Sequence, residues 1–363
     1  MRSAAGQASL ARFNLGVSGG LRLTTQQPWN WNQFVRFRLV FNNNGSGLTR
    51  DGALLSQHLT SLGHQVQTEG LASTLRSRLS RVPLGIWPRQ DVVDANIFLE
   101  SIADRWLPAA RWNVLIPNPE WTLDRDLERL SQIDLVLPKT REGLRAFQHL
   151  GPPVRLLGFT SVDRRTRPGL AATGTLKFLH VAGRSEQKGT GILIRAWTLR
   201  PDWPSLTVVQ RPQRPDHWIR EVKLPNLRHL IGHLPDGQLR RLQNDHAVHI
   251  TPSEAEGFGH TIVEGMSCGG VVVTTDAPPM NELVQPDRGM LVAAERSARQ
   301  RLGTNYYVGL DHVTEAVEKV LALSPAQREA MGRRARAWFE SNNETFVRNL
   351  ASVLQLFQTP SGR

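Results

Sequence analysis

One stretch in the C-terminal half of the chain limits the possible folds more than any other. Residues 247–250 form a short apolar run that predicts a buried strand, and a Gly-Phe-Gly turn follows at 257–259. A helix is expected over 261–267 and a second apolar strand over 271–274. Such a strand–turn–helix–strand unit places a helix N-terminus at the carboxyl edge of a parallel sheet, where phosphates bind.

Charged residues accompany this unit and a second one like it. Glu256 lies on the turn and Glu264 lies within the first turns of the expected helix, so both carboxylates can face the same crevice. A strand expected over 178–182 is followed by Arg184 and Lys188. Arginine as a planar fork and lysine as a point charge can together hold a diphosphate. The two units therefore predict a phosphate site with acidic neighbours.

The spacing of these residues resembles that of a known enzyme family. Gly-Arg-(three residues)-Lys-Gly occurs at 183–189, and Glu-Gly-Phe-Gly follows about 70 residues later, with a second glutamate eight residues after the first. In this order, each after an expected strand, the motifs resemble those of the retaining nucleotide-sugar glycosyltransferases of the GT-B fold, the group 1 transferases. The resemblance implies an α/β fold of two doubly wound, Rossmann-like domains that face a central cleft, with a C-terminal helix that crosses back.

The resemblance also implies a role for each motif residue. Glu256 would hydrogen-bond the donor sugar, and Glu264 would hydrogen-bond the ribose of the donor nucleotide. Arg184, Lys188 and the backbone amides of the turn would face the leaving diphosphate. A glycine loop of the N-terminal domain would face it from across the cleft. The donor would be a UDP-sugar or a GDP-sugar, with no cofactor. The expected donor-binding residues are Gly47, Arg184, Lys188, Glu256, Gly257, Phe258, Gly259, His260 and Glu264.

His260 is unusual at its position, directly after the Gly-Phe-Gly turn. Many relatives carry an apolar or small residue there. The imidazole could donate to a phosphate or a sugar hydroxyl, or it could simply pack at the helix start.

Polar residues also follow the expected strands of the N-terminal half. Glu100 follows a strand over 94–99, and Asn118 and Glu120 follow a strand over 113–116. Because sites in α/β proteins form at the carboxyl ends of strands, these three residues are site candidates, and Asn118 and Glu120 are assigned to the acceptor. Glu120 could equally cap a helix expected over 123–130. The expected catalytic residues are Glu256, Glu100, Arg184 and Lys188.

The distribution of strands, helices and linkers suggests four segments. Residues 163–169 are polar, charged and broken by Pro-Gly, which is typical of a linker. The expected segments are a basic N-terminal extension at 1–33, an N-terminal Rossmann-like acceptor domain at 34–163, a C-terminal Rossmann-like nucleotide-sugar domain at 164–345 and a helix at 346–363 that returns to the N-terminal domain.

The charge of the chain suggests an anionic partner. The formal net charge is +12, and almost all of the positive charge is arginine. Residues 70–90 contain Arg76, Arg78, Arg81 and Arg89 without any acid, which indicates either a solvated helix face or a binding loop. Arg164, Arg165 and Arg167 are expected to assist them in binding phosphates. The first choice for the acceptor is therefore a hydroxymethylated base in DNA, since phage enzymes with this fold modify such bases.

Two alternatives remain open at this point. The enzyme could transfer sugar to a cell-envelope glycolipid or polysaccharide while docked on an anionic membrane. The other possibility is a nucleic-acid-binding protein whose transferase site is vestigial.

Neither a metal nor a membrane span is expected. Asp124-Arg125-Asp126 has the DxD form of metal-dependent sugar transferases, but its helical context favours a solvated helix face. The single cysteine, Cys268, cannot form an intramolecular disulfide, which suits a reducing compartment. No apolar run approaches the roughly 18 residues of a membrane span. These features predict a cytoplasmic, metal-independent enzyme.

Overall fold

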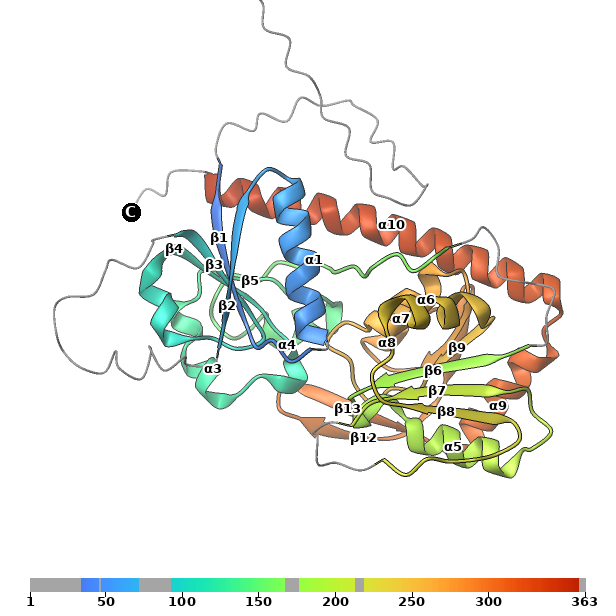
Figure 1. Ribbon diagram of the computed structural model, residues 1–363. Helices are drawn as coiled ribbons and strands as arrows, with labels where there is room; N and C mark the ends of the chain where they lie inside the picture. Colours follow the sequence, from blue (N-terminus) through green and yellow to red (C-terminus); the bar gives the residue numbers. More distant parts are fainter. Residues whose placement is uncertain (1–33, 46, 72–92, 167–175, 213–218, 359–363) are drawn as a thin grey trace, which may run out of the picture. The chain divides into compact units, whose positions relative to one another are not determined.

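The structure, a computed structural model, describes residues 34–45, 47–71, 93–166, 176–212 and 219–358. Within these ranges the chain forms a five-stranded sheet, a six-stranded sheet and a separate two-stranded hairpin (Figure 1). Both larger sheets are parallel and their strands alternate with helices. The predicted class, an α/β fold with two Rossmann-like halves, is confirmed.

The N-terminal half is built on the five-stranded sheet, in the order β2-β1-β3-β4-β5. Its inner strands are buried almost along their whole length, as expected of parallel strands covered on both faces. The strands are β1 (Arg36–Phe41), β2 (Gln65–Gly70), β3 (Val93–Leu99), β4 (Ala110–Ile116) and β5 (Leu135–Val136). The helices and 3-10 turns are α1 (Gly47–Ser61), η1 (Asp104–Ala109), η2 (Pro119–Trp121), α3 (Asp124–Glu128), η3 (Leu130–Gln132) and α4 (Arg141–Phe147).

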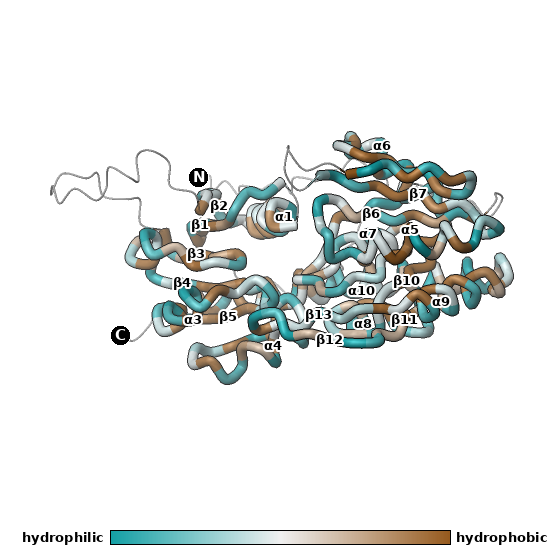
Figure 2. Tube along the Cα trace, turned by 90° about the horizontal axis from the view of Figure 1, so that it is seen from below, coloured by the Kyte–Doolittle hydropathy of each residue, from teal (hydrophilic) through white to brown (hydrophobic). Residues whose placement is uncertain are grey.

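The C-terminal half is built on the six-stranded sheet, in the order β11-β10-β9-β6-β7-β8. Figure 2 shows hydrophobic residues along its central strands. The strands are β6 (Phe178–Gly183), β7 (Leu206–Gln210), β8 (Leu227–Ile231), β9 (Val248–Thr251), β10 (Val271–Thr275) and β11 (Gly289–Val292). The helices are η4 (Glu186–Lys188), α5 (Thr190–Leu199), α6 (Asp236–Asp245), α7 (His260–Ser267), α8 (Met280–Leu283) and α9 (Leu310–Ala322).

A β-hairpin that the sequence pattern did not predict extends from the C-terminal half and contacts the N-terminal half. It consists of β12 (Ala294–Gln300) and β13 (Gly303–Val308), which pair antiparallel. Its turn lies on η2 of the N-terminal half, where Leu302 N donates to Pro119 O at 3.3 Å. A Cβ added to Gly303 would lie only 3.0 Å from the backbone nitrogen of Glu120. A side chain at this turn would therefore fit only if Glu120 moved by a few tenths of an ångström.

The last helix, α10 (Pro325–Gln358), crosses back to the N-terminal half as predicted (Figure 1). Proline at its first position fits a helix start, because that N–H has no intrahelical partner. Near its other end, the Phe357 ring lies 6.0 Å from Phe37 and 5.8 Å from Trp112. The boundary expected at 346 falls inside this continuous helix. Despite its 34 residues, neither α10 nor any other helix in the described ranges has the length and hydropathy to cross a bilayer.

Candidate active site

The strand order of the C-terminal half selects the place where a site can form. The chain runs from β6 to β7 and β8 on one side, and then returns to β9 on the other side of β6. The loops after β6 and β9 therefore diverge, and such a switch point leaves a crevice at the carboxyl ends of the strands. The loop after β6 carries Arg184 and Lys188, and the loop after β9 carries Glu256.

Lys188 and Glu256 meet in this crevice as an ion pair. Their side chains are only 12% and 8% exposed. Ser253 Oγ also donates to Glu256 Oε1 at 2.7 Å, and Thr261 Oγ1 lies 3.4 Å from Lys188 Nζ. A positive and a negative group are thus held side by side, with defined orientations, at the start of α7.

The Gly-Phe-Gly turn is fixed by contacts that only glycine permits. Gly259 has a left-handed φ of 106°, and a Cβ there would lie 2.8 Å from Leu283 Cδ1. A Cβ on Gly257 would lie 2.3 Å from Asn118 Oδ1, which belongs to the N-terminal half. Phe258 between them is buried against Phe159, with ring centroids 5.5 Å apart. The turn is therefore pressed directly against the N-terminal half.

Glu264 lies on the same helix but is almost fully buried. One carboxylate oxygen is 2.8 Å from Arg50 NH1, and the other accepts from Gln243 Nε2 at 2.8 Å. Neither partner could be expected from the local sequence pattern. A ribose hydroxyl would have to share this carboxylate with Arg50.

Arg184 is exposed and faces the loop after β1. Its NH1 donates to Asn44 O at 3.2 Å, and a Cβ on Gly45 would lie 3.9 Å from the same nitrogen. Gly47 begins α1 and has open space where a Cβ would project. The structure thus brings the glycine loop of the N-terminal half close to the basic loop after β6.

Glu100 and Asn118 form a second polar group, at the carboxyl ends of β3 and β4. Glu100 has a left-handed φ of 73°, a conformation rare outside glycine that often marks functional positions. Asn118 Nδ2 donates to Glu100 Oε2 at 2.7 Å, while Asn118 Oδ1 is buried with no hydrogen-bond partner among the described residues. Burial raises the pKa of Glu100, against the effects of Asn118 and Lys139.

Glu120 lies nearby in η2 and is buried. Burial raises its pKa to about 7, and the charges of Glu100 and Glu256 add to this effect while Lys139 opposes it. It does not cap the following helix. The N-cap of α3 is Leu123, whose backbone N–H is bound by Asp126. Glu120 therefore belongs to the polar group at the strand ends.

His260 occupies the first position of α7, and both of its ring nitrogens have protein partners. Nε2 lies 2.7 Å from Asp51 Oδ1, and Nδ1 lies 3.0 Å from Ser161 Oγ. Asp51 is also paired with Lys139 at 2.8 Å. The ring is thus bound within the protein, and only the backbone N–H of His260 remains for the role expected at the turn.

Two expectations about charged residues need correction, and a third concerns residues that the structure does not describe. Asp124 and Arg125 of the DxD sequence are exposed as expected, but Asp126 is fully buried and accepts from Ile102 N at 2.9 Å, so it does not belong to a solvated helix face. Arg164 is buried and paired with Asp236 at 2.7 Å, so it is not available to a polyanion. Arg76, Arg78, Arg81, Arg89 and Arg167 lie outside the described residues. Within the described part of the chain, no group of three His, Cys, Asp or Glu could hold a metal ion.

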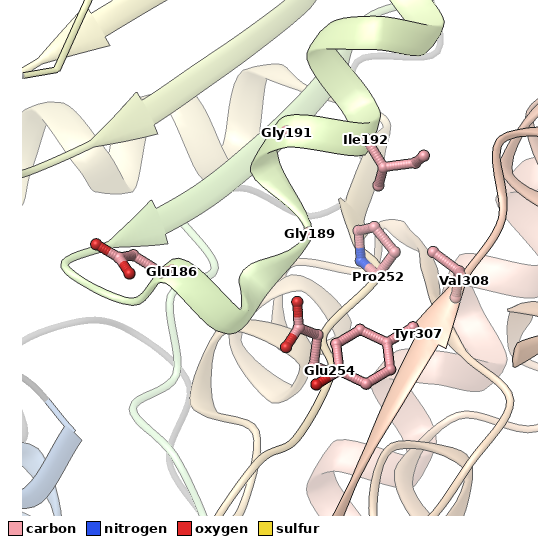
Figure 3. A pocket seen from close by; sticks show the side chains of 8 residues that line it. All are labelled: Glu186, Gly189, Gly191, Ile192, Pro252, Glu254, Tyr307 and Val308. Atoms are coloured by element: carbon pink, nitrogen blue, oxygen red, sulfur yellow. The ribbon is translucent and has the colours of Figure 1, made fainter. Parts of the chain in front are cut away.

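A cavity of about 260 Å³ lies beside the crevice (Figure 3). It is bounded by the start of α5 at Gly189 and Ile192, by Glu254, and by Tyr307 of the hairpin. It shares loops with the ion pair of Lys188 and Glu256 but is lined by neither residue.

The residues that sequence reasoning missed share one property: their partners lie far away along the chain. Asp51 and His260 are separated by 209 positions. Lys139 follows β5 as Glu100 follows β3 and Asn118 follows β4, and this position is the one signal that could have identified it. Asp51 and Arg50 lie inside a helical pattern that gives no such signal.

Comparison with known proteins supports the sequence resemblance. A family model described as "Glycosyl transferases group 1" matches residues 163–338. The "Putative colanic acid biosynthesis glycosyltransferase WcaL" of Escherichia coli (strain K12) is 24% identical over 242 residues. That alignment covers 61% of this chain and 56% of the relative, so it spans little more than half of the relative's length.

Solved structures share the fold across nearly the whole chain. A glycosyltransferase from Rickettsia africae ESF-5 has a TM-score of 0.62 at 14% identity, covering 91% of this chain and 100% of its own. Anabaena Alr3699/HepE in complex with UDP and glucose has a TM-score of 0.63 at 14% identity, covering 88% and 99%.

Proposed function

Because residues 163–338 form a glycosyl transferases group 1 domain on a GT-B fold, we propose that this protein transfers a sugar from a nucleoside-diphosphate sugar to an acceptor hydroxyl. The observation that carries this proposal is the Lys188–Glu256 pair in the crevice at the carboxyl edge of the six-stranded sheet. A bound donor would lie with its diphosphate at Lys188 and its sugar at Glu256. The HepE relative in complex with UDP and glucose is consistent with a donor of this class.

Each group in the crevice has a chemical role in this transfer. Negative charge builds on the diphosphate as it leaves, and Lys188, Arg184 and the N–H groups at the start of α7 are the donors that stabilise it. Glu256 is oriented by Ser253, so it can accept hydrogen bonds from the sugar hydroxyls without reorganising. Because these groups are fixed before the donor binds, they act most strongly in the transition state.

We propose that the acceptor is a carbohydrate. Glu100, which is only partly buried, offers a carboxylate that suits sugar hydroxyls, and the buried Asn118 orients it by donating to its Oε2. The relative named for colanic acid biosynthesis points to a polysaccharide role.

A DNA base, the first choice from the sequence, is less well supported. Glu120 lies within electrostatic reach of both Glu100 and Glu256, so carboxyl groups gather where the acceptor would lie, whereas a phosphate backbone is bound by basic side chains. Arg164, expected to contact DNA, is buried in the protein. Incubation with nucleotide sugars and either oligosaccharides or hydroxymethylated DNA, followed by mass spectrometry, distinguishes the two acceptors. A mass gain on nucleosides alone would refute the carbohydrate proposal.

The donor site is tested by Glu256→Ala and Lys188→Ala. Loss of a contact that acts mainly in the transition state should lower turnover about a hundredfold or more for Glu256→Ala, and Lys188→Ala should also raise the donor KM. The matched control is Glu254→Ala, since Glu254 is two residues away and lines the neighbouring cavity instead. Near wild-type turnover in both crevice variants would show that the ion pair is only structural.

We also propose that the transfer retains the anomeric configuration and needs no divalent metal. Lys188 and Arg184 already supply the positive charge that a metal would bring to the diphosphate. Full activity in excess EDTA is expected, with the product configuration read by NMR. A loss of activity that metal restores would contradict this part of the proposal.

A further inference from the structure

A buried polar network around His260 connects the two halves of the protein. Asp51 lies in α1, Lys139 follows β5, Ser161 lies in the segment between the halves, and His260 begins α7. The bonds run from Lys139 Nζ to Asp51 Oδ2 at 2.8 Å, from Asp51 Oδ1 to His260 Nε2 at 2.7 Å, and from His260 Nδ1 to Ser161 Oγ at 3.0 Å. All four residues are buried.

The charge of Asp51 determines the direction of these bonds. Burial would raise its pKa, but Lys139 and His260 outweigh burial and hold the pKa of Asp51 well below its usual range. An ionised carboxylate only accepts, so Nε2 of His260 carries the shared proton. Ser161 can then donate its hydroxyl proton to Nδ1. Every polar atom of the imidazole is thereby satisfied inside the protein.

A second contact lies one turn further along α7. Glu264 is paired with Arg50, the neighbour of Asp51 in α1. Positions 260 and 264 lie on the same face of a helix, since residues four apart are neighbours. Two consecutive residues of α1 therefore hold one face of α7. The His260 ring is also enclosed by Phe159 and Phe258, at centroid distances of 6.1 and 5.5 Å.

These contacts fix the segment that would bind the donor. His260 directly follows the Gly-Phe-Gly turn, and Gly257 of that turn touches Asn118 of the N-terminal half. Because the ring of His260 is occupied by Asp51 and Ser161, it does not itself reach into the crevice. What it sets is the position of the turn and of the backbone N–H groups at the start of α7.

We propose that His260 is a positioning residue, which ties the start of α7 to Asp51 so that its N–H groups are held ready for the donor diphosphate. This inference rests on the proposed function. It differs from the role expected from the sequence, in which the imidazole itself would contact a phosphate or a sugar hydroxyl. The anchor is Asp51, held by Lys139 in the N-terminal half, so the donor site in the C-terminal half depends on the other half for its geometry.

The experiment replaces His260 by amide side chains, each of which can keep one of its two hydrogen bonds. In His260→Gln the amide nitrogen can reach Asp51, as Nε2 does, whereas in His260→Asn the shorter amide can reach only Ser161. His260→Leu removes both bonds. For the full chain of each variant, hydrogen exchange of the amides at 257–263 is measured without nucleotide, and calorimetry gives the Kd for UDP, GDP, ADP and dTDP. Urea unfolding establishes that each variant is folded.

His260→Leu and His260→Asn should exchange faster at 257–263 and bind the preferred diphosphate on the order of ten- to a hundredfold more weakly, because loss of the hydrogen bond to Asp51 lowers the population of the binding-competent turn. His260→Gln should remain within about threefold of the wild type. A purely structural role would lower the unfolding midpoint without changing the Kd of the folded protein.

The outcomes separate this inference from the proposed function. An unchanged Kd in folded His260→Asn, or equal losses in His260→Gln and His260→Asn, would overturn the positioning role while leaving the donor site intact. If the wild type binds none of the four diphosphates, the proposed function fails, and the positioning role of His260 fails with it. If His260→Leu does not fold, the comparison of His260→Gln with His260→Asn still decides the question.

Discussion

Replacement of Gly257 by alanine tests how closely the two halves approach at the crevice. The added Cβ would lie 2.3 Å from Asn118 Oδ1 and 2.7 Å from Asn118 Cγ, far inside van der Waals contact. The backbone itself is no obstacle, because Gly257 is not among the residues with a left-handed φ. Either Asn118 must turn away or the turn must move back from the N-terminal half.

The cost can be worked out from the bond that Asn118 would lose. Its Nδ2 donates to Glu100 Oε2 at 2.7 Å, and a hydrogen bond to a charged group contributes roughly 1.5–3 kcal/mol. If the turn stays in place and Asn118 is displaced, Gly257→Ala loses this bond. The value of kcat/KM for sugar transfer should then fall roughly ten- to 150-fold. Urea unfolding should show that the variant remains folded.

A double-mutant cycle isolates this contact from other effects. In an Asn118→Ala background the clash is gone, so Gly257→Ala should cost little further activity. Gly191→Ala is the matched control, because a Cβ at Gly191 meets nothing within 4 Å. An equal penalty for Gly257→Ala with and without Asn118 would refute the close approach of the two halves on which the reasoning depends.

Two further predictions concern stability. The carboxyl of Glu120, with a pKa of about 7 in the fold against an ordinary value of 4.5, binds its proton more tightly when folded, so wild-type stability should fall between about pH 4.5 and 7. Glu120→Gln has no carboxyl to titrate, so its stability should not fall in this way. In urea unfolding, the unfolding free energy of Glu120→Gln relative to that of the wild type should be higher at pH 8 than at pH 5 by about 3 kcal/mol. The same difference at both pH values would contradict the raised pKa. Phe357→Ala should lower the unfolding free energy by about 3–5 kcal/mol, since its buried ring packs on Phe37 and Trp112. A change under 1 kcal/mol would mean that the end of α10 contributes little to the fold.

Much of the donor side could be predicted because its signals are local. Apolar runs, glycine turns and helix starts occupy neighbouring positions, and they correctly placed Arg184 and Lys188 after β6 and Glu256 after β9. Parallel strands end at one edge of the sheet, so the residues after them had to be near one another. The same reasoning placed Glu100 and Asn118 together, where a hydrogen bond joins them. The β12–β13 hairpin could not be predicted because its exposed first strand has little alternation of hydrophobic and polar residues.

Local sequence patterns were therefore enough to predict most of the order of the elements and the residues at the strand ends. The partners of those residues depended on how one half packs on the other. Asp51 binds His260, Arg50 binds Glu264, and the β12–β13 turn fits against Glu120 only in the folded chain. Burial, too, is a tertiary property: Glu120 has its raised pKa because surrounding elements remove it from water. Local patterns encode strands and turns, whereas contacts between residues hundreds of positions apart are specified by the shapes and charges of two complete surfaces.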